Sequence, residues 1–216
     1  MSALIFFTTP TEIILAMDTL AVRGENGTPH LFTTKFYPVP HLRGAICGTG
    51  IGQFIIDWFV SVNTNMVVDD IPNLDYHTPA ALRDLWATRY KDFPVTSTST
   101  IYHFGFGWAT GQPCVYAYRS EKNFESESLP IGQLAVKPEG DVPDPFELPT
   151  DFEKIMTSQR EKQRVKPLAD RIYIGGEILV CRFTEEAMTI SRAGAFPDRD
   201  EHRAIMFANV QRKADS

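Results

Sequence analysis

Residues 2–21 read SALIFFTTPTEIILAMDTLA, two apolar runs separated by a short polar stretch. The runs, at 2–9 and 13–21, are rich in the β-branched and aromatic residues typical of strands, and residues 10–12 between them favour a turn. Both runs are apolar on both faces, which predicts strands that are covered on each side. Chain ends are usually poorly ordered. We nevertheless expect this hairpin to lie inside the fold, so that the residues at the N-terminus are held in place.

Strand patterns recur along most of the chain. Further strands are predicted at residues 35–39, 42–47, 101–108, 115–119, 133–136, 177–183 and 188–192. The glycine, asparagine and proline content of residues 23–34 predicts a loop, and the acidic, proline-rich residues 137–149 predict an exposed connection. The charged tail after Ala193 shows no clear pattern.

Three helices are expected between these strands. The glycine-rich turn GTGIG leads into residues 54–62, which are apolar nearly all round and predict a buried helix. A second helix is predicted over 79–93, with Thr78 as its N-cap and Pro79 in its first position. The third is predicted over residues 150–164, where apolar side chains share one face.

The order of these elements predicts the fold class. Strands and helices do not alternate strictly, as they would in a parallel βαβ fold. We therefore expect an α+β protein in which antiparallel sheets are covered by helices. A length of 216 residues suits one or two domains, and the continuous strand pattern predicts a single domain over residues 1–216.

Composition excludes several classes of function. Acidic residues outnumber basic ones by 27 to 21, and the net charge of −6 is spread along the chain. This charge argues against nucleic acid or an anionic membrane as a partner, since both need a basic face. No apolar window is long enough to cross a membrane, and the N-terminus lacks a signal-peptide pattern. We expect a soluble, cytoplasmic protein.

The cysteines and histidines predict neither disulfides nor a metal site. Cys47, Cys114 and Cys181 are odd in number, widely spaced and set among apolar neighbours, as buried thiols are in a reducing compartment. The five histidines show no metal-ligand spacing; they are His30, His41, His77, His103 and His202. No cofactor and no metal are expected.

Several features, in this order, resemble the proteasome β-type branch of the N-terminal nucleophile (Ntn) hydrolases, including its bacterial relatives. Ser2 stands where the family has its threonine nucleophile, and Asp18 in LAMDT is similar to the family's LAADT at the family's spacing. Lys35 in TTKFYPV takes the place of the active-site lysine. Gly48 ends an apolar strand before the first helix, and residues 174–194 resemble the family's Gly-Gly, strand, turn and strand ending.

The resemblance implies a fold and a mechanism. The fold is a four-layer αββα sandwich, and the reaction is hydrolysis of a peptide or other amide substrate by a homo-oligomer. After removal of Met1, the free α-amine would act as base for the Ser2 hydroxyl. Lys35 would lower the pKa of that amine, Asp18 would hold Lys35, and the Gly48 N–H would stabilise the oxyanion.

The chain also departs from the family pattern. Residues 171–174 read RIYI where the family carries a supporting aspartate and serine, and Asp170 is one residue further away than expected. Residues 136–175 offer one clear helix instead of two, which predicts a reduced second helical layer.

Two other interpretations remain open. The first is a proteasome-like scaffold that has lost catalysis and serves in binding or assembly. The second is a small-molecule-binding α+β domain unrelated to the proteasome. In either, Asp18 could end a strand, Lys35 could be an exposed edge lysine and Gly48 could serve packing alone.

Overall fold

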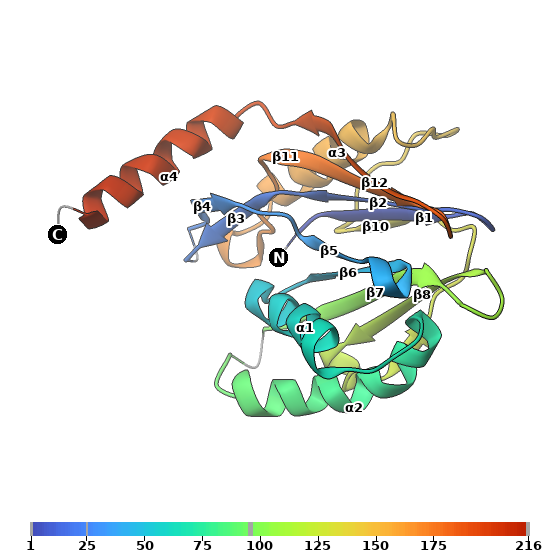
Figure 1. The fold of residues 1–216 in the computed structure, drawn as a ribbon. Coiled ribbons are helices and arrows are strands. Elements are labelled where there is room, and N and C mark those ends of the chain that lie inside the picture. Colours follow the sequence, from blue (N-terminus) through green and yellow to red (C-terminus); the bar gives the residue numbers. More distant parts are fainter. Residues whose placement is uncertain (1, 25, 95–96, 215–216) are drawn as a thin grey trace.

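The computed structural model describes residues 2–24, 26–94 and 97–214, with side chains as far as Gln211 (Figure 1). Its strands form two five-stranded antiparallel sheets and one small two-stranded sheet. Together with the helices, this confirms the α+β class predicted from the sequence.

The first large sheet contains the N-terminal hairpin. Its strand order is β10 (Ala135–Lys137), β1 (Leu4–Thr8), β2 (Ile13–Asp18), β11 (Glu177–Phe183) and β12 (Met188–Ala195). β1 and β2 pair along their whole length, and every residue of β2 is buried. The prediction of a covered N-terminal hairpin is therefore confirmed.

The second large sheet comes from the middle of the chain. Its order is β5 (Phe36–Val39), β6 (Gly44–Thr49), β7 (Thr100–Phe106), β8 (Pro113–Arg119) and β9 (Ser126–Ser128). The two large sheets face each other across an apolar core, to which Leu4, Phe6 and Leu15 contribute from one side and Phe36, Cys47 and Phe104 from the other. Burial of these side chains is the main force that holds the sheets together.

Helices cover the outer faces of both sheets (Figure 1). α1 (Gly52–Asn65) and α2 (Ile71–Arg89) pack on the second sheet, where Phe54, Trp58 and Leu82 are fully buried. α3 (Phe152–Arg164) covers the first sheet alone through Phe152, Ile155 and Met156. α4 (Arg199–Ala214) extends away from both sheets (Figure 1). Three short 3₁₀ turns lie at Pro40–Leu42, Ser120–Lys122 and Leu168–Asp170.

Two predictions were wrong. Residues 23–34 are not a loop throughout, because β3 (Leu20–Arg23) and β4 (Thr28–Phe32) form the small sheet. Pro29 stands opposite Val22, next to a shift in register, which is a position where a strand tolerates proline. The tail after Ala193, where no pattern was clear, completes β12 and forms α4.

The second wrong prediction concerns the start of α2, which begins at Ile71 and not at Pro79. The Asp70 carboxylate caps the helix by accepting a hydrogen bond from the Asn73 N–H at 2.8 Å. Pro79 lies inside the helix, where the Thr78 hydroxyl donates to the Leu74 carbonyl at 2.7 Å. The helix therefore uses an N-cap about two turns before the Thr-Pro pair that resembles a helix start.

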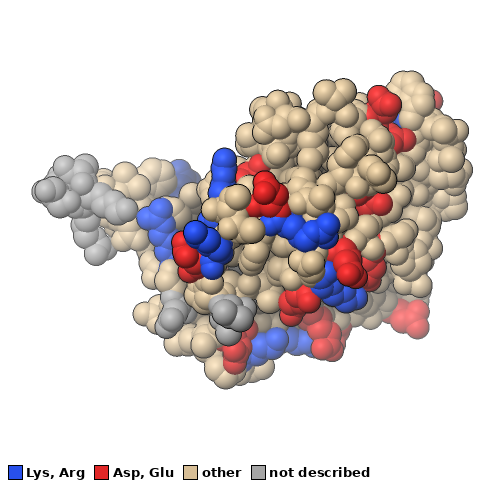
Figure 2. Space-filling view, turned by 90° about the horizontal axis from the view of Figure 1, so that it is seen from below, with Lys and Arg blue, Asp and Glu red and all other residues tan. Residues whose placement is uncertain are grey.

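Figure 2 views the molecule from the α1 and α2 side, and acidic and basic side chains are interspersed there without forming a patch of one sign. Among the helices that the structure describes, none combines the length and apolarity that a membrane span requires.

Candidate functional site

Asp18, the last residue of β2, is completely buried and connects three parts of the chain. Its Oδ1 accepts hydrogen bonds from the Ala3 N–H at 2.9 Å and from Lys35 Nζ at 2.9 Å. Its Oδ2 accepts from the Gly175 N–H at 3.2 Å. These donors offset the loss of hydration that burying a carboxylate entails. The start of β1, Lys35 and the glycine turn before β11 are therefore held around one carboxylate.

Lys35 lies just before β5 and reaches from the second sheet to the first. Besides Asp18, its ammonium donates to the Leu20 carbonyl oxygen at 2.7 Å, and its side chain is only 10% exposed. Lys35 is therefore not the exposed edge lysine that was the alternative interpretation of the sequence. A lysine held by a carboxylate and a carbonyl oxygen has a fixed position, and Lys35 lines the same cavity as Ser2.

Ser2 lines a cavity of about 400 Å³ together with Lys35 and Gly48. Its backbone is fixed on one side, since the next residue donates its N–H to Asp18. No hydrogen bond within the described residues joins the Ser2 hydroxyl to Lys35. The remaining walls are mainly apolar and include Leu20, Ala21, Val22, Leu31, Ile55 and Ile56. The structure thus brings Ser2, Lys35 and Gly48 to one cavity, with Asp18 directly behind Lys35.

Gly48 occupies a position that only glycine fits. It pairs with Ile101 in the sheet, and a Cβ atom there would lie 2.6 Å from the Thr100 carbonyl oxygen and 2.8 Å from Cγ1 of Ile55. The turn that follows contains Gly50 at φ +110°, a conformation that favours glycine. The Ile51 N–H donates to Ser99 Oγ at 3.0 Å, which fixes the turn before α1.

Two other titratable groups at or near the cavity, Cys47 and Tyr37, have pKa values above their ordinary range. Burial, with a smaller effect of Cys181, raises the pKa of the Cys47 thiol. Burial and Cys47 raise the pKa of Tyr37, which lines the cavity. All three cysteines are free; Cys47 and Cys181 are buried and Cys114 is partly buried. None of these groups is poised to act as a nucleophile near neutral pH.

The residues just before Gly175 do not reach the cavity. Arg171 donates to the Arg164 and Lys166 carbonyl oxygens at 2.6 and 3.0 Å, so its guanidinium binds the end of α3. Asp170 is exposed in a 3₁₀ turn. The supporting side chains expected from the family pattern are therefore not supplied by residues 170–174.

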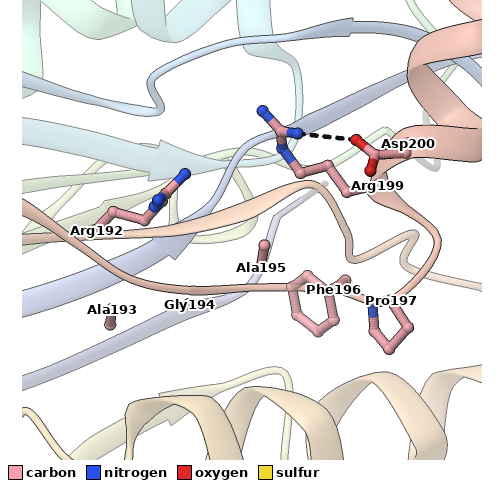
Figure 3. Close-up of a pocket in the computed structure, with 8 residues that line it drawn as sticks. All are labelled: Arg192, Ala193, Gly194, Ala195, Phe196, Pro197, Arg199 and Asp200. Carbon is pink, nitrogen blue, oxygen red and sulfur yellow. Dashed lines mark hydrogen bonds and ion pairs between the residues drawn. The ribbon is translucent and has the colours of Figure 1, made fainter.

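A second cavity, of about 440 Å³, lies where β12 ends and α4 begins (Figure 3). Its arginines, Arg192 and Arg199, both bind Oε1 of Glu177 at 3.0 Å, and Arg199 also binds Asp200. None of the four predicted site residues lies there. Among the described residues, no group of three or more His, Cys, Asp or Glu side chains could hold a metal ion.

Sequence reasoning missed the backbone groups of the site. The Ala3 and Gly175 N–H groups and the Leu20 carbonyl have no residue-type signature; the paired glycines at 175 and 176 were the one signal available. Ser99, which fixes the glycine turn, was also missed. Comparison with protein-family models gives no match, and no curated protein matches the chain.

Proposed function

We propose that this protein is a proteasome-like Ntn amide hydrolase that cleaves peptides or other amides through Ser2. In this proposal, the two large sheets with α1 and α2 on one side and α3 on the other are the four-layer αββα sandwich of that class, with its second helical layer reduced. The observation that carries the proposal is that Ser2 shares a cavity with Lys35, whose ammonium pairs with the buried Asp18.

The chemistry requires Ser2 to be the first residue. Its α-amine, with an ordinary pKa of about 7.7–8.0, takes the proton of the Ser2 hydroxyl while the oxygen attacks the substrate carbonyl carbon. The Lys35 ammonium lowers the pKa of that amine by like-charge repulsion, so more of it is neutral at pH 7. Asp18 keeps Lys35 in place and charged.

The attack on the carbonyl carbon forms a tetrahedral intermediate, which then collapses to an ester on Ser2. The carbonyl oxygen carries the negative charge, and the Gly48 N–H donates to it, an interaction worth roughly 2.7–4 kcal/mol in comparable sites. The C–N bond breaks as the leaving amine takes the proton back from the α-ammonium. Water next attacks the ester and gives a proton to the α-amine. The bond between the acyl carbon and Ser2 Oγ then breaks, and the α-ammonium returns the proton to Ser2 Oγ, which releases the acid and restores the hydroxyl.

The cavity beside Ser2 suits an apolar side chain of the substrate. Leu20, Val22, Leu31 and Ile55 are among the apolar residues of its walls, and burial of an aliphatic side chain against them is favourable by about 25 cal/mol per Å². We propose that substrates with a medium-sized apolar residue before the scissile bond are preferred.

A catalytically inactive scaffold for binding or assembly is the second candidate. It is favoured by one observation, that residues 170–174 leave the site without a supporting acid or serine side chain. In this case the Asp18–Lys35 pair would serve only to join the two sheets. Assembly into a homo-oligomer is compatible with both candidates.

The experiment that separates them measures turnover. A chain that begins at Ser2 is incubated with short fluorogenic peptide amides that carry leucine before the leaving group, beside its Ser2→Ala variant. The hydrolase proposal predicts amide cleavage by the first chain and none by the second. Equal rates, or no cleavage by a folded chain with a free Ser2 amine, would favour the scaffold.

A further inference from the structure

Two lysines cross the space between the large sheets in opposite directions. Lys35 directly precedes β5 of the second sheet and binds Asp18 of the first. Lys137, the last residue of β10 in the first sheet, donates from Nζ to Oγ1 of Thr100 in the second sheet at 3.1 Å. The proposed mechanism uses the first lysine but not the second.

Lys137 lies close to the strand that carries Ser2. In the pairing of β10 with β1, Lys137 stands opposite Leu4, whose side chain is buried between the sheets. Residues that stand opposite each other on paired strands face the same side of a sheet. Lys137 is therefore on the face of the first sheet that borders the second sheet, opposite a residue two positions along the chain from Ser2.

Thr100 lies directly against the proposed oxyanion donor. It pairs with Thr49, and its carbonyl oxygen is the atom that a Cβ on Gly48 would meet at 2.6 Å. The Thr100 residue is only 4% exposed, and the preceding residue, Ser99, fixes the glycine turn through the Ile51 N–H. Any force that holds Thr100 thus also holds Gly48.

The environment of Lys137 differs from that of Lys35. No carboxylate among the described residues forms an ion pair with Lys137, and its Nζ lies 5.9 Å from the centroid of the Tyr102 ring. Burial and the nearby Arg119 lower the pKa of Lys137, while Glu121 raises it. Partial burial of a lysine without a carboxylate partner lowers the stability of the fold. A residue kept at this cost is a candidate for a role in the site.

We infer that Lys137 is a positioning residue of this site, which through Thr100 holds the Gly48 strand at a fixed distance from the Ser2 strand. The inference rests on the proposed hydrolase function and adds to it. Lys35 and Lys137 then each link the two large sheets, Lys35 through Asp18 and Lys137 through Thr100. Loss of the hydrogen bond between Lys137 and Thr100 displaces the oxyanion donor from the nucleophile and leaves the substrate cavity intact.

The test uses two probes on the chain that begins at Ser2. A peptide β-lactone acylates Ser2 through a tetrahedral oxyanion, whereas a peptide vinyl sulfone adds to it without an oxyanion at a carbonyl. Lys137→Met and Thr100→Val each remove one end of the hydrogen bond at nearly constant shape. Each is expected to slow the β-lactone reaction by about 10- to 100-fold and to change the vinyl sulfone reaction much less.

Three further variants make the test specific. The double variant is expected to react no more slowly than the slower single variant, since both remove the same interaction. Thr100→Ser restores the hydroxyl and is expected to recover the β-lactone rate. Lys91→Met alters an exposed lysine that does not line the Ser2 cavity and serves as the control for loss of charge. Thermal unfolding of each variant identifies any that fails to fold.

The outcomes separate the two proposals. If the starting chain reacts with neither probe, the hydrolase function fails and the positioning role with it. If the starting chain reacts, and Thr100→Val reacts with the β-lactone as fast as Thr100→Ser, the positioning role alone is overturned. Equal slowing of the β-lactone and vinyl sulfone reactions in Lys137→Met and Thr100→Val would also overturn it. A general loosening of the fold slows both reactions, whereas loss of the oxyanion donor slows only the β-lactone reaction.

Discussion

Lys35 Nζ lies 2.9 Å from the Asp18 carboxylate, and Asp18 is completely buried at the end of β2. Asp18 belongs to the first large sheet and Lys35 directly precedes β5 of the second. The ion pair therefore joins the two sheets next to Ala3, whose N–H also donates to Asp18. An ion pair at this depth makes a poor contribution to stability by itself but is costly to break, because the remaining charge has no partner.

Removal of the Asp18 charge is expected to destabilise the fold and stop the reaction. Asp18→Asn leaves the Lys35 ammonium without its counter-ion, at a cost of about 3–5 kcal/mol in the free energy of unfolding. Urea unfolding measures this. Arg89→Met, which breaks a surface pair with Asp57, is the control and should change stability by less than about 1 kcal/mol. Similar losses for both variants would contradict the account of the site.

A methyl group at Gly48 is expected to distort the site. Gly48→Ala places a Cβ against the Thr100 carbonyl oxygen, and the overpacking should cost about 1–3 kcal/mol of stability. The matched variant is Gly52→Ala at the start of α1, where a Cβ would meet nothing within 4 Å, so its stability should be unchanged or slightly higher. Thermal melts compare the two, and an equally stable Gly48→Ala would show that the turn is not tightly packed.

The size of the cavity should set the choice of substrate. Ala21→Phe adds a ring to one wall, which is expected to lower kcat/KM for a peptide amide with leucine before the scissile bond about 10-fold or more relative to one with alanine. The ratio of the two rates is the quantity to measure, since it is insensitive to the fraction of active protein. An unchanged ratio would place the substrate side chain elsewhere.

The buried His103 should make stability fall in acid. Its Nε2 accepts a hydrogen bond from Trp58 Nε1 at 2.8 Å, and burial lowers the pKa of its imidazole from 6.5 to about 3. The unfolded chain binds a proton near pH 6.5 that the folded chain does not bind until about pH 3. The contribution of neutral His103 is therefore complete above pH 6.5 and is lost as the pH falls toward 3.

This effect can be isolated by substitution. The stability of His103→Gln, whose side-chain oxygen can still accept from Trp58, should fall less steeply below pH 6.5, by up to about 1.4 kcal/mol per pH unit. The matched variant His77→Gln changes an exposed histidine and serves as the control for substitution of a histidine. Urea unfolding at pH 7 and pH 5 is sufficient, and identical slopes for both variants would show that His103 does not titrate on unfolding.

The parts of the fold that were predicted are those with a strong local pattern. Strand pairs such as β1 with β2 follow from apolar runs around a turn, and α3 from its apolar face. The start of α2 was missed because Thr78 and Pro79 mimic a helix start inside a helix, whereas Asp70 is the real cap. In α4, apolar and polar residues are not separated onto two faces, so the helical period of apolar residues is absent from its sequence.

The site was predictable to the extent that residue types mark it. The resemblance predicts that Asp18 and Lys35 pair, and they do. The contact between Lys137 and Thr100 could not be foreseen, because it depends on how one sheet stacks on the other and not on any local pattern. Backbone donors such as the Gly175 N–H are equally invisible in a sequence.

The central claim, that the Ser2 hydroxyl reacts with its own α-amine as base, is tested most directly by intact mass. Two forms of the chain, one beginning at Ser2 and one keeping Met1, are incubated with a peptide β-lactone and weighed. The account predicts one adduct on the first form, mapped to Ser2 and lost in Ser2→Ala, and none on the second. Equal modification of both forms, or an adduct that survives Ser2→Ala, would contradict it.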